Sequence, residues 1–367
     1  MRRRSFLKAS ALGLTSLALP RPVFTAPKAA YLADQPVAQA ATPRSEAWRT
    51  IEVVTKFDFE ARAGAVLWIP LPKTKTTYQE LLSTSWKASL SNVEIAKDLT
   101  YDDTFLCAHV QQTNPGLFEL TYRVRVRDRD GAEPALFGER EKFLKPTEHV
   151  QIDGVVAETA HKIVKNAQDS DKKARLIYDW IVENTQRDAS VRGCGLGDVK
   201  STLTSGNLAG KCADLGSLFV GLARATGVPA REMFGCRALP SGLAKCLGKD
   251  GDISKGQHCR VEYLSERKKG WMPLDPADVR KAILEEKLSL TDPVIKSIRQ
   301  KLFGFWEMNW IAYNSARDFS LPGSDASESD KINFLMYPRL IAGAEVRDGM
   351  EPDRFRYTMT ARQIVNH

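Results

Sequence analysis

The feature that most constrains the fold of this chain is a cysteine at the start of a strongly periodic apolar segment. Cys212 follows Gly-Lys, and apolar side chains in residues 215–231 recur at the three- and four-residue intervals of a helix with one buried face. Gly227 and Pro229 are typical of the end of that helix. Cys212 is therefore expected in the first turn of a buried helix. Unpaired backbone N–H groups and the positive end of the helix dipole there favour a thiolate over a thiol.

Two later segments supply the other groups that a sulfur nucleophile needs. His258 opens HCRVEYL, whose alternating β-branched and aromatic residues predict a strand, and Asp275 ends a second short strand that Pro276 stops. A thiolate needs an imidazole within hydrogen-bond reach, and the imidazole needs a third group that fixes its tautomer. The three residues are too far apart for one helix, so we expect them to meet through tertiary structure.

Three blocks of the chain resemble the transglutaminase-like superfamily of cysteine enzymes. They are GKCADLGSLFVGLARATGVPAR, QHCRVEYL and GWMPLDPADV, and they occur in the order of the family. The resemblance covers roughly residues 150–290. It implies a papain-like α+β core, in which the helix bearing the cysteine packs on an antiparallel sheet. It also implies Cys212 as nucleophile, His258 as base and acid, and Asp275 as the orienting group. The chain departs from the pattern at Arg260, where many relatives carry an aromatic residue, and this leaves substrate preference and cross-linking activity open.

The identity of the orienting carboxylate has an alternative. Asp278 follows Asp275 in the same block, and either side chain can orient His258 or cap a turn. We favour Asp275, because the strand ends there and strand ends present catalytic groups at clefts.

The oxyanion hole is predicted less sharply than the triad. The backbone N–H of Cys212 is one expected donor, since it points out of a helix N-terminus. Asn207 and Gln257 are the candidate side-chain donors, with Trp180 as a competitor. Asn207 lies beside Gly206 and equally suits a turn.

The first forty residues predict a twin-arginine export signal. Arg3 and Arg4 precede Ser-Phe-Leu-Lys, and the apolar stretch 9–19 is too short to span a membrane. Cleavage is expected after Ala40, with a cut after Ala26 as the alternative. The mature protein is then expected to be periplasmic or secreted, without stable membrane insertion.

Loss of this leader also changes the charge of the chain. The leader carries six basic residues and one acid, so its removal lowers the formal net charge from +8 to +3. The remaining charges of both signs are interleaved, which gives no case for binding nucleic acid.

Six cysteines in an oxidising compartment invite disulfides. Cys212 must stay free, and pairs of Cys236 with Cys259 or of Cys194 with Cys246 are conceivable; Cys194 is otherwise expected to line the cleft. Cys107 is the sixth cysteine. No spacing resembles a zinc site, and we expect no metal and no cofactor.

The rest of the chain predicts three regions after the leader. Residues 41–150 are expected to form a small β-sandwich and a polar linker, 151–290 the core, and 291–367 an extension packed on the core. Strands are predicted over 48–59, 65–72, 91–99, 104–112 and 116–128, and helices over about 154–167, from Asp169 or Ser170 to Asn184, and over 294–302. The glycine-rich segment 185–211 is expected to be a flexible approach to Cys212, and the aromatic block 303–310 to be core more than cleft wall.

These residue types support acyl transfer. Cys212 would attack an amide carbonyl of a peptide or protein substrate and form a thioester, which water or an amine resolves. We favour hydrolysis, as in a protease or amidase, because water is in vast excess and no acceptor-amine site is legible. The alternatives are a transglutaminase proper and, in another class, a non-catalytic periplasmic binding or assembly protein of the same fold.

Overall fold

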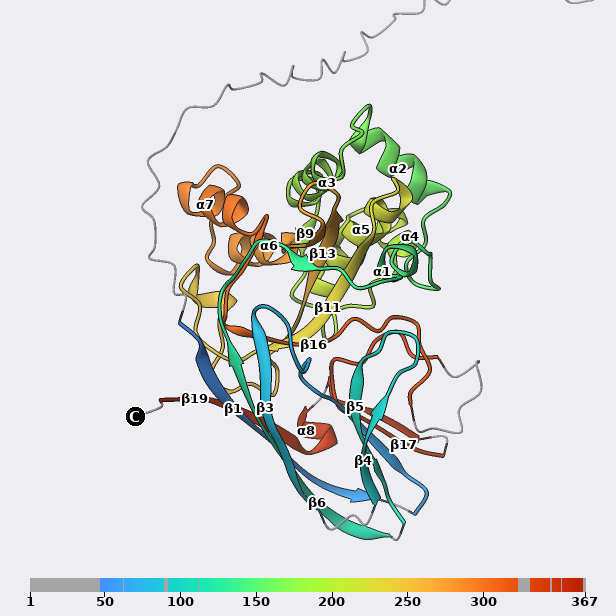
Figure 1. The fold of residues 1–367 in the computed structure, drawn as a ribbon, viewed down its shortest axis with the longest axis vertical. Coiled ribbons are helices and arrows are strands. Elements are labelled where there is room, and N and C mark those ends of the chain that lie inside the picture. Colours follow the sequence, from blue (N-terminus) through green and yellow to red (C-terminus); the bar gives the residue numbers. More distant parts are fainter. Residues whose placement is uncertain are drawn as a thin grey trace, which may run out of the picture. The chain divides into compact units, whose positions relative to one another are not determined.

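The part of the chain that positions the site is a helical layer packed on one antiparallel sheet (Figure 1). The computed structural model describes residues 47–365, except for 62, 89–91, 112, 323–330, 344 and 351. The predicted leader and both of its cleavage positions lie outside the described residues.

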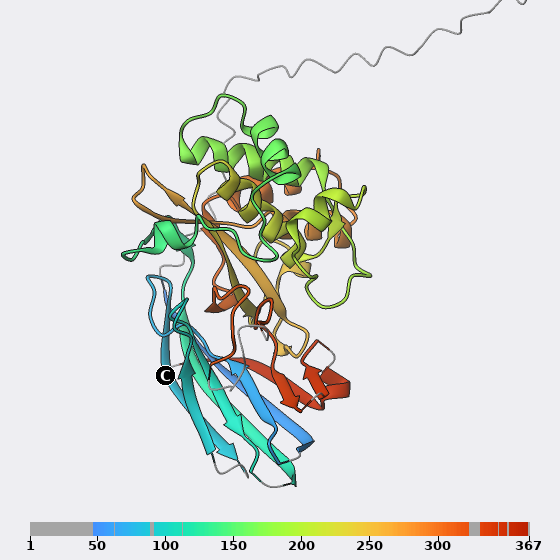
Figure 2. The ribbon, with the colours of Figure 1, turned by 90° about the vertical axis from the view of Figure 1, so that its right-hand side faces the viewer.

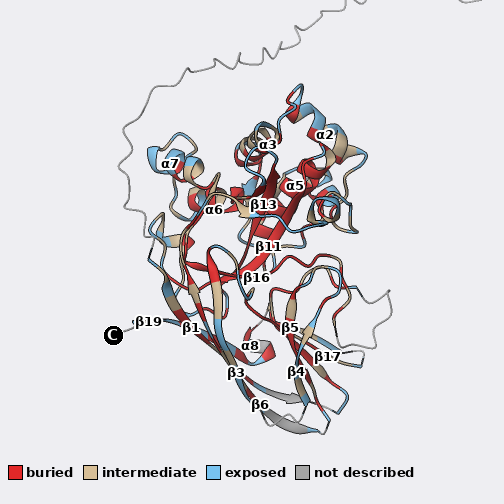
Figure 3. Cartoon of the chain, in the orientation of Figure 1, coloured by how far each residue is buried: buried red, intermediate tan, exposed pale blue. Residues whose placement is uncertain are grey.

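The core sheet has five strands in the order β16-β11-β13-β14-β8. Their bounds are β8 Glu133–Pro134, β11 Ala230–Arg237, β13 Gln257–Ser265, β14 Gly270–Leu274 and β16 Trp310–Asn314. The central strands β11 and β13 are buried along their whole length (Figure 3). Strands that are buried in this way must have other elements packed on both faces of the sheet. The helices pack on one face, and the N-terminal β region described below packs on the other.

The helices of the core surround a long buried helix, α5 (Cys212–Ala225), which packs against β11 and β13. α3 begins as predicted, because the Asp169 side chain accepts a hydrogen bond from the backbone of Lys172 at 2.9 Å. The other helices of this layer are α2 Val155–Val164, α3 Ser170–Asn184, α4 Val199–Thr204, α6 Pro276–Glu285 and α7 Pro293–Lys301.

A β region built from two five-stranded sheets contains the N-terminal strands (Figure 2). One sheet has the order β12-β19-β1-β6-β3 and the other β18-β17-β2-β5-β4. Their bounds are β1 Arg49–Ala61, β2 Val66–Pro70, β3 Gln79–Ala88, β4 Asn92–Lys97, β5 Thr104–His109, β6 Asn114–Val126, β12 Gly251–Asp252, β17 Arg339–Ala342, β18 Glu345–Asp348 and β19 Tyr357–Ile364. The five strands predicted between residues 48 and 128 are all present, as β1, β2, β4, β5 and β6, whereas β3 was not predicted from the sequence.

The segments on either side of the core take part in both sheet systems. The expected polar linker contributes the edge strand β8 and the short helix α1 (Glu139–Lys142). The segment 291–367 contributes β16 to the core sheet, while β17, β18 and β19 join the two sheets of the β region. Apolar residues of β11 and β16 share one buried cluster with the β region, so the two parts pack on a common core.

The expected fold class is confirmed: this is an α+β protein with antiparallel sheets and a helix-on-sheet core that bears Cys212. Among the described residues no helix is long and apolar enough to cross a membrane. The remaining short elements are β7 Arg129–Asp130, β9 Gln186–Arg187, β10 Ala209–Gly210, β15 Phe305–Trp306, α8 Pro352–Phe355 and the 3-10 turn η1 Lys245–Leu247.

Candidate active site

Cys212 is the first residue of α5, so its backbone N–H has no acceptor within the helix. Asp214 closes this end of the helix: its carboxylate accepts hydrogen bonds from the backbone N–H groups of Lys211 at 2.8 Å and Gly197 at 2.9 Å. The chain before Cys212 wraps tightly around that carboxylate. At Gly195, with φ of +92°, a Cβ would lie 1.9 Å from an Asp214 oxygen. Gly193, Gly195, Gly197 and Gly210 of this segment therefore serve close packing, whereas Gly206 does not, and the segment also contains α4.

His258 and Asp275 meet in the buried floor of the site. Strand β13 begins one residue before His258, and α6 begins one residue after Asp275. His258 Nε2 lies 2.7 Å from Asp275 Oδ2. The other oxygen of Asp275 accepts the backbone N–H of Asp278 at 2.9 Å and so caps α6. One carboxylate thus holds both the imidazole, through Nε2, and the N-terminus of α6.

Asp278 has a different partner. Arg237, the last residue of β11, holds its carboxylate with two hydrogen bonds of 2.5 and 3.1 Å. The nearer Asp278 oxygen is 3.4 Å from His258 Nε2, farther than that of Asp275. The geometry therefore places Asp275 as the direct partner of the imidazole and Asp278 as the counter-ion of Arg237.

Arg260 supports this arrangement from the other side. Its guanidinium donates to the backbone oxygen of Glu307 and to Asn309 Oδ1, both at 2.9 Å, and its Nε is 3.8 Å from Asp275. Trp310 stacks on it at 4.9 Å and donates its indole N–H to the backbone oxygen of His258 at 2.8 Å. The aromatic block 303–310 thus belongs to the packed core, as favoured, and holds the imidazole strand in place.

Three thiols cluster at the start of α5, and their pKa values move in opposite directions. Hydrogen bonding with Cys194, then with Cys259, and the interaction with His258 lower the pKa of Cys212 well below its usual value, although burial opposes this. The hydrogen bond to Cys212 and burial raise the pKa of Cys194. Burial and Cys212 raise that of Cys259. Cys212 is therefore the thiol of this group that ionises first.

The acids of the site polarise His258 toward its charged form. Burial and the Arg237 charge oppose protonation, but Asp278 and Asp275 outweigh them and raise the pKa of His258. Burial and the neighbouring Asp278 raise the pKa of Asp275. The pKa of Asp278 is lowered despite burial, because Arg237 and His258 stabilise its charge. A thiolate beside an imidazolium is the pair that these shifts favour.

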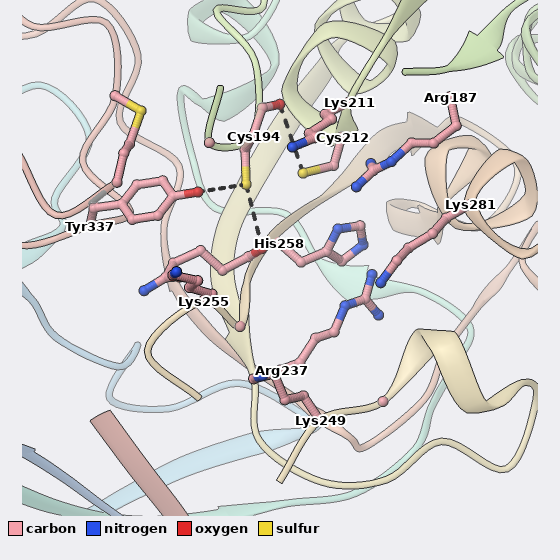
Figure 4. Close-up of a pocket in the computed structure, with 15 residues that line it drawn as sticks. Arg187, Cys194, Lys211, Cys212, Arg237, Lys249, Lys255, His258, Lys281 and Tyr337 are labelled. Atoms are coloured by element: carbon pink, nitrogen blue, oxygen red, sulfur yellow. Dashed lines mark hydrogen bonds between the residues drawn. The ribbon is translucent and has the colours of Figure 1, made fainter. Parts of the chain in front are cut away.

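Cys212 and His258 both line one pocket of about 360 Å³ (Figure 4). Its wall includes Cys194, whose Sγ is 3.0 Å from the Tyr337 hydroxyl. Cys194 therefore lines the cleft, which is one of the two places expected for it. The pocket is large enough for a short stretch of a peptide.

Comparison with known proteins identifies the family and the fold of the chain. Residues 157–276 match the transglutaminase-like superfamily. An uncharacterized protein of Haemophilus influenzae is 35% identical over 328 residues, which are 81% of this chain and 86% of that protein. The crystal structure of a candidate cysteine protease from Cytophaga hutchinsonii superposes with a TM-score of 0.53 at 15% identity, over 88% of this chain and 92% of that one. This chain belongs to the transglutaminase-like superfamily.

The two predicted side-chain oxyanion donors of this transglutaminase-like protein lie in different places. Asn207 is exposed, and its Oδ1 accepts from Ser205 Oγ at 3.2 Å and from the backbone of Ala209 at 3.1 Å. It is the turn residue of the alternative interpretation and is not part of the pocket wall. Gln257 lines the pocket, with its Nε2 on Met359 Sδ at 3.7 Å and its buried Oε1 without a hydrogen bond. Its role as a donor stays a prediction.

All six cysteines are free thiols. The conceivable bridge between Cys236 and Cys259 does not form, because Cys236 is paired with Gln257 and Cys259 with Phe234 across the two strands. Cys194 faces the pocket and is likewise not joined to Cys246.

One group of potential metal ligands in the described part of the chain coincides with the site: His258, Asp275 and Asp278. Arg237 and Arg260 already contact the two carboxylates, and their charges oppose a cation there. This set therefore fits a network of hydrogen bonds and ion pairs around His258 better than a metal centre.

Sequence reasoning missed most of the pocket wall. It named Cys212, His258, Gln257 and Cys194, but not the basic side chains that line the same pocket, nor Tyr337 from the C-terminal segment. Signals existed for two of them: Lys211 directly precedes Cys212, and Lys281 follows Asp278 by three residues and so shares its face of α6. The others come from segments that local periodicity does not connect.

Proposed function

We propose that this protein is a cysteine-dependent enzyme that cleaves amide bonds of a peptide or protein substrate through a thioester. The observation that carries the proposal is the meeting of a low-pKa thiol, Cys212, with His258 in one pocket, while Asp275 holds the imidazole at 2.7 Å. These are the parts that nucleophilic acyl transfer requires.

The steps follow from the positions of these groups. The Cys212 thiolate attacks the amide carbonyl, and the backbone N–H of Cys212, at the N-terminus of α5, would stabilise the oxyanion. Protonated His258 then donates its proton to the leaving amine, which leaves a thioester on Cys212. Neutral His258 next removes a proton from water, and attack by that water on the thioester releases the acid, expels the Cys212 thiolate and leaves the imidazolium, which restores the starting pair.

Hydrolysis is favoured over transfer to a lysine side chain by the charge of the pocket wall. Six basic side chains line it, and no acid does so among the described residues. Such a wall repels a lysine ammonium, whereas water enters freely.

The experiment compares the wild type with Cys212→Ala and His258→Ala on a library of quenched peptides. Both variants are expected to lose cleavage by at least about 10⁴-fold, with an unchanged unfolding midpoint, and hydroxylamine should trap the acyl group in the wild type. Incorporation of a lysine peptide in place of hydrolysis would indicate a transglutaminase. Full activity of folded Cys212→Ala would sink the enzymatic proposal and favour the non-catalytic binding protein.

We also propose that the protein is exported by the twin-arginine route, on the strength of Arg3, Arg4 and the apolar stretch that follows them. Replacing both arginines by lysines should leave uncleaved protein in the cytoplasm. Normal accumulation of that variant outside the cytoplasm would contradict the proposed route.

A further inference from the structure

The pocket that holds Cys212 and His258 is surrounded by positive charge. Its basic side chains come from separate segments: β9, the residue before α5, the end of β11, the loops on either side of β12, and α6. They are Arg187, Lys211, Arg237, Lys249, Lys255 and Lys281. No aspartate or glutamate lines this pocket among the described residues. The six basic side chains come together only in the tertiary structure, because they belong to segments that are far apart in the sequence.

Three of these cations already have partners within the protein. Arg237 is held by Asp278, as described above. Lys281 donates to the backbone oxygen of Cys246 at 2.6 Å and lies 3.8 Å from Glu285. Lys255 pairs at 3.4 Å with Asp353, although both side chains are exposed.

The other three, Arg187, Lys211 and Lys249, form no ion pair with any carboxylate of the described residues. They are each partly shielded from solvent. The Nε of Arg187 is buried and has no hydrogen-bond partner within the described chain. That atom is too buried for a substrate to reach, but Arg187 lines the pocket, so the other N–H groups of its guanidinium are the ones that can donate to an acceptor that enters there.

The catalytic steps do not use these three charges. The Cys212 thiolate is balanced by the His258 imidazolium, and Asp275 and Asp278 are balanced by His258, Arg237 and Arg260. Unneutralised cations around a concave, partly desolvated pocket produce a positive potential that attracts and holds anions. The planar fork of Arg187 in particular matches the two oxygens of a carboxylate.

The basic side chains also lie on more than one side of the nucleophile. In Figure 4 the side chains of Arg187, Arg237 and Lys281 run toward the imidazole of His258, whereas Lys255 lies beyond it on the side of Tyr337. Burial and the neighbouring Arg237 lower the pKa of Lys281, as expected where like charges gather without enough acid between them. A substrate anion bound beside these two cations would relieve this repulsion.

We propose that the substrate is an acidic peptide, bound with carboxylates on both sides of the amide that Cys212 attacks. The inference rests on the proposed amide-cleaving function, because carboxylates are the anions that an unmodified peptide brings to such a site. It names the class of substrate, which the triad alone does not.

The test uses pairs of quenched peptides that are identical except for Glu or Gln at the positions flanking the scissile bond. The wild type is expected to cleave the Glu member with kcat/KM higher by about tenfold or more, and added salt should shrink that ratio. Arg187→Gln and Lys249→Gln should lower cleavage of the Glu peptide and leave the Gln peptide nearly unchanged. The matched control is Lys296→Gln, an exposed lysine of α7 outside the pocket, which should change neither.

The outcomes separate this inference from the proposed function. Equal Cys212-dependent cleavage of both peptides overturns the inference and leaves the amide-cleaving function standing. If Arg187→Gln and Lys249→Gln lower kcat/KM equally for both peptides, the inference is also overturned. The two side chains would then position the site and would not bind the carboxylates of the substrate.

If neither peptide is cleaved, the proposed function fails and binding decides the inference. Titration of fluorescent Glu and Gln peptides into Cys212→Ala should show tighter binding of the Glu peptide, again by about tenfold. Equal binding, or none, overturns the inference. Binding of a phosphoserine peptide far more tightly than its Glu counterpart would replace it by a phosphorylated ligand.

Discussion

Strand β13 carries two buried clusters of charge that differ in what surrounds them. The His258 cluster consists of His258 and Arg260 of β13 with Arg237, Asp275 and Asp278. The Glu262 cluster lies farther along the strand and consists of Glu262 with Arg129, Arg231 and Glu139. Within each cluster, short hydrogen bonds link the charged side chains, and an aromatic ring stacks on one of the arginines.

The Glu262 cluster has two acids and two arginines and none of the titratable imidazoles or thiols of the site. Arg231 binds Glu262 at 2.5 Å and Glu139 at 2.6 Å, and Arg129 pairs with the other Glu262 oxygen. Despite burial, Arg129 and Arg231 lower the pKa of Glu262 to about 2. This cluster stays charged at every physiological pH and joins α1 to β11 and β13.

The His258 cluster also contains two buried acids and two arginines, but it borders a pocket and a thiol. Its central group is an imidazole whose pKa is raised by the two acids despite burial and the Arg237 charge, and the two acids have pKa values displaced in opposite directions. Burial and dense charge therefore do not by themselves mark a catalytic site. Access from a pocket and a group that can exchange a proton distinguish one cluster from the other.

The largest expected contrast concerns activity. Asp275→Asn should lower kcat by about 10²–10⁴-fold, because the imidazole loses the carboxylate that orients it. The unfolding midpoint should change little, since asparagine also caps a helix. Activity assays and thermal unfolding of the same preparation measure both.

Asp278→Asn is the matched control three residues away. It should lower stability by leaving Arg237 buried without its counter-ion, and lower activity per folded molecule less than Asp275→Asn does. The reverse ranking of the two activities would make Asp278 the orienting group.

At the Glu262 cluster we expect the opposite result. Glu262→Gln should reduce the free energy of unfolding by about 3–5 kcal/mol, because two buried guanidinium groups lose their shared counter-ion. Activity per folded molecule should stay within about twofold of the wild type. Urea denaturation and an active-site titration at neutral pH measure the two quantities.

The pH dependence of the free energy of unfolding provides a control for the prediction on Glu262→Gln. Because the pKa of Glu262 falls from 4.5 to about 2 on folding, its charge stabilises the folded state above pH 4.5. That stabilisation is lost as the pH falls toward 2. The variant should lack this part of the acid-induced loss; an unchanged stability profile would mean that the cluster contributes little.

The smallest expected effect is a difference in thiol reactivity. Cys212 should be alkylated by iodoacetamide at pH ~6 at least about tenfold faster than a free thiol of pKa ~8.5. Cys194 and Cys259, whose pKa values are raised, should remain unmodified. Because the pKa of His258 is raised, the imidazolium that pairs with the thiolate persists as the pH rises past 6.5. Peptide mapping by mass spectrometry measures the three rates, and equal rates would contradict the lowered pKa of Cys212.

The sequence by itself determined the local parts of the site. The apolar period after Cys212 predicts α5, the alternation after His258 predicts β13, and the strand end at Asp275 predicts a carboxylate that orients His258. Each of these follows from residues within one helix or strand, where periodicity records which face is buried.

Only the tertiary structure decided what lies opposite those faces. The roles of Asp275 and Asp278 diverge because Arg237 arrives from β11 and takes one of them. Residues expected as a linker supply Glu139 to a buried cluster, and the C-terminal strands complete sheets begun by the N-terminal ones. The basic wall of the pocket is assembled from distant segments. Hydrophobic periodicity specifies that a face is buried but not its partner, which depends on long-range packing and strand pairing.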